Sequence, residues 1–187
     1  MDKIIVLMGY AKSGKDFTCQ RLQEAMPDYN FKRFALADFL KELMCIVLDM
    51  TREDMEEWKN HDTANRQRLI DFSEKGIKQV DTCFWVKKFG VDYLKNRGNY
   101  IITDARYYEE YYYLKEFAAK NPNTLKIIFV YVNRVHEDEN LNVNGMHPDV
   151  YTKCGMKMEK ADADYIYNNF ENNDICFDNL VSFIENE

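Results

Sequence analysis

The residues best suited to chemistry lie near the amino terminus, where a glycine-rich segment follows the apolar run 4–8. The segment reads Gly9-Tyr10-Ala11-Lys12-Ser13-Gly14-Lys15-Asp16-Phe17-Thr18. A short buried strand, a loop ending in Gly-Lys and a following helix are the context of a phosphate-binding loop of the Walker A type. Backbone N–H groups of such a loop converge on nucleotide phosphates, and the helix N-terminus adds partial positive charge. The sequence therefore predicts an ATP-binding segment over 9–18, with the Lys15 ammonium at the β- and γ-phosphates.

Asp16 stands where this kind of loop usually has a Ser or Thr whose hydroxyl binds Mg²⁺. A carboxylate about 4 Å from a phosphate charge is repelled by roughly 4 kcal/mol at an effective dielectric of about 20. A Mg²⁺ ion between the two groups removes this cost, because carboxylates are good Mg²⁺ ligands. Alternatively, Asp16 turns away and stabilises the first helical turn, where negative charge is favourable. We favour a position near the metal, direct or through water.

A second pattern is an apolar strand that ends in an acid and a base, Ile101-Ile102-Thr103-Asp104-Ala105-Arg106. Strands of an open α/β sheet point their carboxyl ends at the ligand crevice, so Asp104 is expected beside the loop. There it would orient Mg²⁺ or accept a proton, while Arg106 would bind a phosphate through its bidentate fork. Glu110, one turn further on, would hold the Arg106 guanidinium. The alternative is a capping Asp paired with a nearby Arg.

Basic residues elsewhere are expected to bind a second, phosphate-bearing substrate. Arg66 and Arg68 lie on one predicted helix, with Glu74 further along and Trp85 as an aromatic wall for a base. A solvated helix face is the alternative for this set. Two more polar residues open another predicted helix near the ligand edge, Asp38 and Lys41.

Arg134 follows the strand-like run 125–132 and opens the polar stretch 135–160. An arginine in this place can stack on an adenine or neutralise the transferring phosphoryl group. The alternative is a surface arginine that balances the acidic run 137–139. The stretch itself is too long for a simple connection, so we expect a lid-like segment at about 134–160, with a plain surface excursion as the alternative.

The elements that must position these residues follow from hydrophobic periodicity. The predicted strands are 3–8, 31–35, 99–103, 125–132 and 164–168. The predicted helices are 14–26, 37–49, 65–76, 83–96, 107–120 and 177–186. Apolar strands that alternate with amphipathic helices predict a three-layer α/β/α fold with a mainly parallel central sheet. We expect one domain over 1–187, with a helical, acceptor-binding region at about 51–98.

Composition narrows the class of protein. The chain has 187 residues, 46% of them hydrophobic, which suits a folded domain of ordinary size. A net charge of −7 argues against a nucleic-acid-binding protein, so local basic groups must bind any phosphate. The cysteines at 19, 45, 83, 154 and 176 form no CxxC pair and indicate reduced thiols rather than disulfides or zinc ligands. With no apolar stretch long enough for a membrane span, we expect a cytoplasmic, soluble protein.

Taken in order, these residues resemble the phage-type deoxynucleoside monophosphate kinases, a P-loop family related to adenylate and guanylate kinases. That family typically has a loop of the form G-x-x-x-S-G-K-D. Residues 9–16 resemble this form, including the unusual Asp16. Its later motifs are resembled in the same order along the chain. The segment 34–41 resembles F-A-x-A-x-x-L-K, and 66–74 with Trp85 resembles R-x-x-L-Q-x-x-G-T-E with a following Trp. The segment 104–110 resembles D-V-R-F-x-N-E, and 164–168 resembles D-Y-x-I-x-N. The chain departs from the pattern at Phe17, where the family has Thr, and at Phe72-Ser73, where it has Gly-Thr.

The resemblance implies transfer of the γ-phosphoryl group of ATP to a deoxynucleoside 5′-monophosphate. It implies Mg²⁺ held through Asp16 and Asp104, and catalytic roles for Lys15, Asp104, Arg106 and Arg134. It places the acceptor on Asp38, Lys41, Arg66, Arg68, Glu74, Trp85 and Glu110. Relatives commonly form dimers, which leaves a homodimer open. Two alternatives remain: another small-molecule kinase such as phosphomevalonate kinase, whose sequences share the Lys-Ser-Gly-Lys-Asp-Phe stretch, and a non-catalytic nucleotide-binding module.

Overall fold

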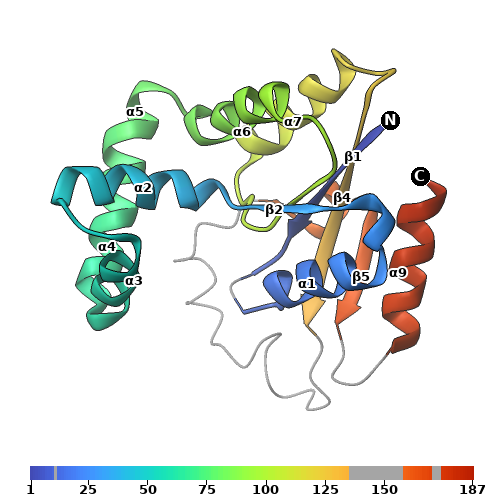
Figure 1. Ribbon diagram of the computed structural model, residues 1–187, viewed down its shortest axis with the longest axis horizontal. Coiled ribbons are helices and arrows are strands. Elements are labelled where there is room, and N and C mark those ends of the chain that lie inside the picture. Colours follow the sequence, from blue (N-terminus) through green and yellow to red (C-terminus); the bar gives the residue numbers. More distant parts are fainter. Residues whose placement is uncertain (11, 135–157, 170–173) are drawn as a thin grey trace. The chain divides into compact units, whose positions relative to one another are not determined.

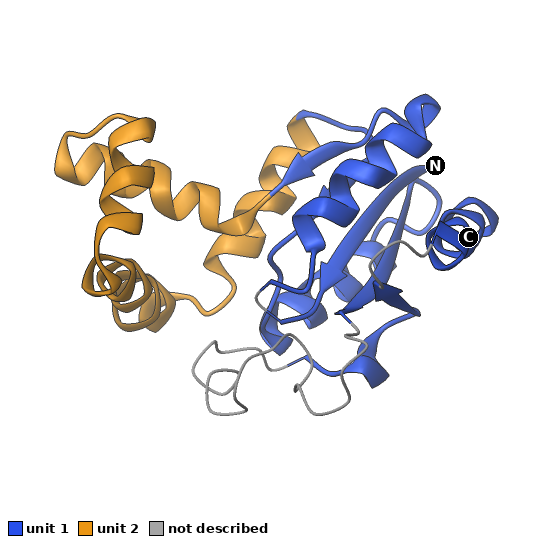
Figure 2. Cartoon of the chain, turned by 90° about the horizontal axis from the view of Figure 1, so that it is seen from below, with its two compact units in different colours: residues 1–34, 96–187 blue, residues 35–95 orange. Residues whose placement is uncertain are grey.

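The computed structural model describes residues 1–10, 12–134, 158–169 and 174–187. They fall into two units, coloured separately in Figure 2: unit 1 comprises 1–34 and 96–187, and unit 2 comprises 35–95. The chain therefore leaves unit 1 after its second strand, builds unit 2 and returns for the rest of the sheet.

Unit 1 is built on a five-stranded sheet of β1 (Asp2–Met8), β2 (Lys32–Phe34), β3 (Tyr100–Ile102), β4 (Leu125–Arg134) and β5 (Tyr165–Asn169). The strand order is β2-β3-β1-β4-β5, and every neighbouring pair is parallel. In the register, Ile5 of β1 lies between Ile101 of β3 and Ile128 of β4. Because the strands are parallel, the carboxyl ends of all five meet at one edge of the sheet.

Helices cover both faces of this sheet (Figure 1). On one face, α1 (Lys15–Ala25) and α9 (Asp174–Asn186) share a core with the central strands. Its members include Leu7, Leu22 and Leu180, none of them exposed to solvent. On the other face lies α7 (Tyr108–Ala119), whose Tyr111 ring is 4.7 Å from the ring of Phe129 on β4. Strands buried on both faces explain the continuous apolar runs of the sequence. Two short 3₁₀ turns complete the unit, η1 (Pro27–Tyr29) and η3 (Lys160–Asp162).

Unit 2 is entirely helical among its described elements. It contains α2 (Leu36–Leu48), α3 (Arg52–His61), α4 (Thr63–Asp71), the π-helical segment η2 (Phe72–Ile77), α5 (Lys78–Val80) and α6 (Phe84–Lys95). Met44, Met55 and Leu69 form one buried cluster in this unit, and Trp58 and Phe72 pack against them. The segments α4, η2 and α5 follow one another without a break, so the π-helical turn interrupts one long helical run.

All five strands predicted from the sequence are found, and the α/β class with a parallel central sheet is confirmed. Two helical details differ from the prediction. The run 65–76 is not one α-helix, because its second half is π-helical. Helix α3 was not predicted, since it is mostly polar and buries only Met55; its start signal was the capping box that Thr51 and Asp54 form. The lid-like segment expected at 134–160 lies outside the described residues except at its ends. No helix in the described part of the chain combines the length and hydropathy needed to cross a bilayer.

Candidate functional site

The loop after β1 has a backbone that only glycine adopts easily at two positions. Gly9 has φ +135° and Gly14 has φ +96°, both in the region that L side chains rarely occupy. A Cβ on Gly9 would lie 2.6 Å from the carbonyl oxygen of Val132, so β4 passes too close for any side chain. The loop is thus tightly wrapped against the sheet edge. Ala11 lies outside the described residues.

Lys15 is folded over this loop. Its Nζ donates to the carbonyl oxygens of Gly9 at 2.7 Å and Tyr10 at 2.6 Å. Helix α1 begins at Lys15 with Gly14 as its N-cap, and no side chain caps that end. The first N–H groups of a helix have no intrahelical acceptor, so here an ammonium and uncapped N–H groups adjoin one loop. This arrangement suits a polyphosphate anion.

Two strand ends support the loop from outside. Asn169, at the end of β5, donates from Nδ2 to the Ser13 carbonyl oxygen at 3.1 Å. Arg134, at the end of β4, donates from Nη1 to the Lys12 carbonyl oxygen at 3.3 Å. Sequence reasoning singled out Arg134 for the transferring phosphoryl group, a role that stays a prediction, and it missed Asn169. The signal for Asn169 was its place just after a predicted strand, at the edge where the loop lies.

Asp16 is paired with an arginine that the sequence did not indicate. Arg33, on β2, donates from Nε and Nη2 to Asp16 Oδ1 at 3.2 and 3.1 Å. The Arg33 side chain is 45% exposed and the Asp16 side chain 75%. Thr18, by contrast, is buried, and its Oγ1 has no hydrogen-bond partner among the described residues. Phe17 is 57% exposed beside the loop.

The chemistry of the carboxylates fits a magnesium ion. Asp16 opens the helix after the loop, and Asp104 follows β3, whose carboxyl end lies at the same sheet edge. No cluster of three acidic, histidine or cysteine side chains is found within the described ranges. Such a cluster is not required, because Mg²⁺ in phosphoryl-transfer sites is commonly held by one or two carboxylates and substrate phosphates. Asp16 and Asp104 are therefore the residues that would hold it.

Glu110 fixes the backbone that carries Arg106. Glu110 is 4% exposed, and its carboxylate accepts hydrogen bonds from the backbone N–H groups of Arg106 at 2.8 Å and Tyr107 at 3.2 Å. It therefore closes the capping box at the start of α7. Thr103 extends the β2–β3 ladder through its N–H to the Phe34 carbonyl oxygen at 3.0 Å. The segment after β3 is thus held at both ends, and Asp104 and Arg106 are half-buried between them.

In unit 2, Asp38 and Lys41 belong to an ion-pair network. Lys41 Nζ lies 2.6 Å from Glu56 Oε1 and 3.5 Å from Asp38 Oδ1, and Arg52 Nη2 lies 2.5 Å from the same Asp38 oxygen. Lys59 also pairs with Glu56. Burial alone raises the pKa of the Glu56 carboxyl, but hydrogen bonds and charges from Lys41 and Lys59 outweigh it and lower the pKa to about 2. The network joins α2 to α3.

The other residues expected at the acceptor lie in two settings. Arg66 and Arg68 are exposed on α4, with Arg68 Nη1 2.7 Å from Asn65 Oδ1. Trp85 is only 5% exposed, and its Nε1 donates to Ser73 Oγ at 2.8 Å. Beside Ser73, Glu74 pairs with Lys78 at 3.1 Å across one turn of the π-helical segment. The roles of all four predicted residues stay predictions.

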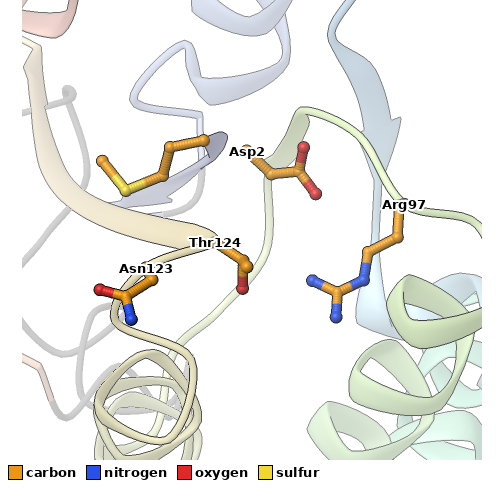
Figure 3. A pocket seen from close by; sticks show the side chains of 5 residues that line it. Asp2, Arg97, Asn123 and Thr124 are labelled. Atoms are coloured by element: carbon orange, nitrogen blue, oxygen red, sulfur yellow. The ribbon is translucent and has the colours of Figure 1, made fainter.

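Unit 1 has a surface cavity of about 330 Å³ (Figure 3). Its lining includes Asp2, Arg97, Asn123 and Thr124, and the Arg97 side chain extends toward Thr124. Asp2 begins β1 and Thr124 precedes β4, so the cavity is at the amino ends of the strands. The phosphate-binding loop is at the opposite, carboxyl edge. The cavity therefore takes no part in the candidate site.

Comparison with known proteins establishes the fold. No protein-family model and no curated protein sequence matches the chain. A candidate kinase from Chloroflexus aurantiacus is similar with a TM-score of 0.55 at 10% identity, over 99% of this chain and 94% of that one. An uncharacterized protein from Eubacterium ventriosum is similar with a TM-score of 0.52 at 13% identity, over 100% of both chains. The APS kinase of Mycobacterium tuberculosis has a TM-score of 0.49 at 10% identity, over 98% and 97%. The first two likenesses show a shared fold and leave the reaction open.

Proposed function

We propose that this protein is a P-loop kinase that transfers the γ-phosphoryl group of ATP to a deoxynucleoside 5′-monophosphate. The observation that carries the proposal is the loop between β1 and α1. Its two glycines have positive φ, Lys15 is folded over it, and the helix end behind it is uncapped. Of the likenesses that share the fold, one is to a candidate kinase. The choice of acceptor rests on the ordered motifs of the sequence.

Phosphoryl transfer needs in-line positioning and charge neutralisation more than covalent help from the protein. Lys15 would exchange the carbonyls of Gly9 and Tyr10 for the donor phosphates. Arg106 and Arg134 would neutralise the charge that develops on the transferring group. Asp16 and Asp104 would hold Mg²⁺, which would supply charge neutralisation for the donor phosphates when bound. Because the acceptor is itself a phosphate anion, no strong general base is required.

For the acceptor, we propose a set of unit 2 residues. Arg66 and Arg68 are exposed and carry guanidinium groups whose fork matches a phosphate. Asp38, Lys41 and Glu74 would supply further polar contacts. Trp85, which is buried, would lie behind the surface that contacts the base and support it. Glu110, in unit 1, would act by fixing Arg106.

The test is ATP consumption by the purified protein with Mg²⁺ against deoxy- and ribonucleoside monophosphates and phosphomevalonate. We expect turnover with at least one deoxynucleoside monophosphate and its loss in Lys15→Ala. Lys126→Gln is the matched control, since Lys126 pairs with Glu187 at 2.7 Å near the amino end of β4, away from the loop. Turnover with phosphomevalonate alone would replace the acceptor. Nucleotide binding without any turnover would indicate a binding module instead.

A further inference from the structure

Beside the loop, one ion pair joins helix α1 to the edge strand β2. Arg33 reaches Asp16 with two of its nitrogen atoms, Nε at 3.2 Å and Nη2 at 3.1 Å. Both bonds end on Oδ1, and Asp16 Oδ2 accepts from no residue in the described part of the chain. The sheet order places β2 at one edge, two strands from β1 and its loop. The pair therefore draws the carboxylate toward the β2 side of the sheet.

The pair offsets the negative charge that Asp16 brings next to the phosphate-binding loop. Asp16 lies in the first turn of α1, next to the N–H groups expected to receive phosphate oxygens. An uncompensated carboxylate there would repel a nucleoside triphosphate. Two other cations near the loop are already engaged with its backbone: Lys15 with two carbonyl oxygens and Arg134 with one. Arg33 differs from both, because two of its nitrogen atoms donate to Asp16 itself.

A buried thiol reports on the same two charges. Cys19, one turn further along α1, is 1% exposed, and burial raises its pKa to about 11. The Arg33 charge lowers this value and the Asp16 charge raises it, so the two residues act there with opposite sign.

We propose that Arg33 is a positioning residue of the nucleotide site, which neutralises Asp16 and holds its carboxylate so that the loop accepts a nucleoside triphosphate. This inference rests on the proposed function only in requiring that the loop bind ATP. It also explains how an aspartate replaces the usual hydroxyl without losing phosphate affinity. Arg33 acts through Asp16, and its effect is largest when no metal lies between the carboxylate and the phosphates.

The experiment is a double-mutant cycle read by binding of a fluorescent ATP analogue, in EDTA and in excess Mg²⁺. In EDTA, Arg33→Gln should weaken binding about three- to tenfold, while Asp16→Asn should strengthen it. In Mg²⁺ the loss in Arg33→Gln should shrink. In the double variant Arg33→Gln should have little further effect, because the charge it compensates is gone. Arg33→Lys, which keeps the charge, should retain most of the affinity.

Lys126→Gln is the control, because it removes an ion-paired positive charge whose exposure, 39%, is close to the 45% of Arg33, near the other end of the sheet. The inference is overturned if Arg33→Gln binds like the wild type, or if its loss persists in full beside Asp16→Asn. Should Arg33→Gln prove unstable in thermal unfolding, Arg33→Lys and Asp16→Asn decide together. Loss of most of the affinity in Arg33→Lys, or no gain in Asp16→Asn in EDTA, would then overturn the inference. If the variants show the expected affinities but the wild type shows no turnover, the kinase assignment is overturned and this inference stands.

Discussion

Gly14 lies where the loop, helix α1 and strand β5 meet. A Cβ at this position would lie 2.3 Å from Asn169 Nδ2, and φ is +96°. We expect Gly14→Ala to displace Asn169 from the Ser13 carbonyl and to weaken binding of the ATP analogue at least about tenfold. Gly76→Ala is the matched control, since no atom would lie within 4 Å of its Cβ. Equal affinities of the two variants would contradict the structure of the loop.

Cys19 gives a test of burial that needs no ligand. Its pKa is raised from 9.0 to about 11, chiefly by burial. A folded-state pKa above the unfolded value contributes stability that is complete below about pH 9 and is lost as the pH rises through about 11. Near neutral pH we expect iodoacetamide to label the less buried Cys45 before Cys19, as read by peptide mass spectrometry. Labelling of both at the same rate in the native protein, as in urea, would show that Cys19 is accessible.

At this scale the sequence predicts residues of a contiguous motif far better than residues that meet by folding. Lys15 and the two loop glycines follow from their own neighbours in the chain. Arg33 and Asn169 do not, because their contacts depend on how β2 and β5 align with a loop far away in sequence. Asp164, noted as a motif residue, accepts the Phe129 N–H at 2.8 Å and so serves the sheet.

Lys3 connects two elements of unit 1. It is 9% exposed, and its Nζ donates to the carbonyl oxygens of Ile184 at 2.6 Å and Glu185 at 3.2 Å, in the last turn of α9. A cation at a helix C-terminus satisfies free carbonyls and the helix dipole. We expect Lys3→Met to lower the free energy of unfolding by about 1–3 kcal/mol in urea titrations. Lys126→Met, at the paired position on β4, should cost under about 1 kcal/mol. Equal losses would contradict this role.

The network between α2 and α3 makes unit 2 sensitive to acid. The pKa of Glu56 is lowered from 4.5 to about 2 because hydrogen bonds and charges from Lys41 and Lys59 outweigh its burial. A depressed pKa contributes stability that is present above about pH 4.5 and is lost as the pH falls toward 2. We expect Glu56→Gln to reduce the fall in melting temperature between pH 6 and about pH 3, followed by circular dichroism. An unchanged slope would mean that the network adds nothing to stability; Glu53→Gln, on the same helix, is the control.

The elements of unit 1 were more predictable than those of unit 2 for a physical reason. A buried parallel strand is apolar on both faces, so its signal survives without knowledge of its neighbours. Helix α3 buries one residue, Met55, and carries its stability in its cap and its ion pairs. The π-helical turn contains Ser73, whose hydroxyl accepts the hydrogen bond of the Trp85 indole N–H. The pattern of apolar residues in the local sequence does not predict this contact.

At the scale of the whole molecule, a chain of net charge −7 would bind a polyanion through a few placed cations. If a nucleotide binds as proposed, its phosphates should affect the backbone of 9–18 in unit 1 first, whatever the acceptor. The number of buried side chains around each element is expected to set how fast its amides exchange.

The buried cluster around α3 is smaller than the cluster on the sheet of unit 1, and hydrogen exchange should show it. The unit 1 cluster has fourteen buried members across strands and helices, whereas the described cluster around α3 has three. Amides open locally with a free energy that follows the packing around them. We therefore expect β1 and β4 to exchange slowest, α3 and α4 much faster, and ATP with Mg²⁺ to slow exchange within 9–18. Equal protection of α3 and β1 would mean that unit 2 opens only when unit 1 unfolds, so that the small cluster is not the limiting core.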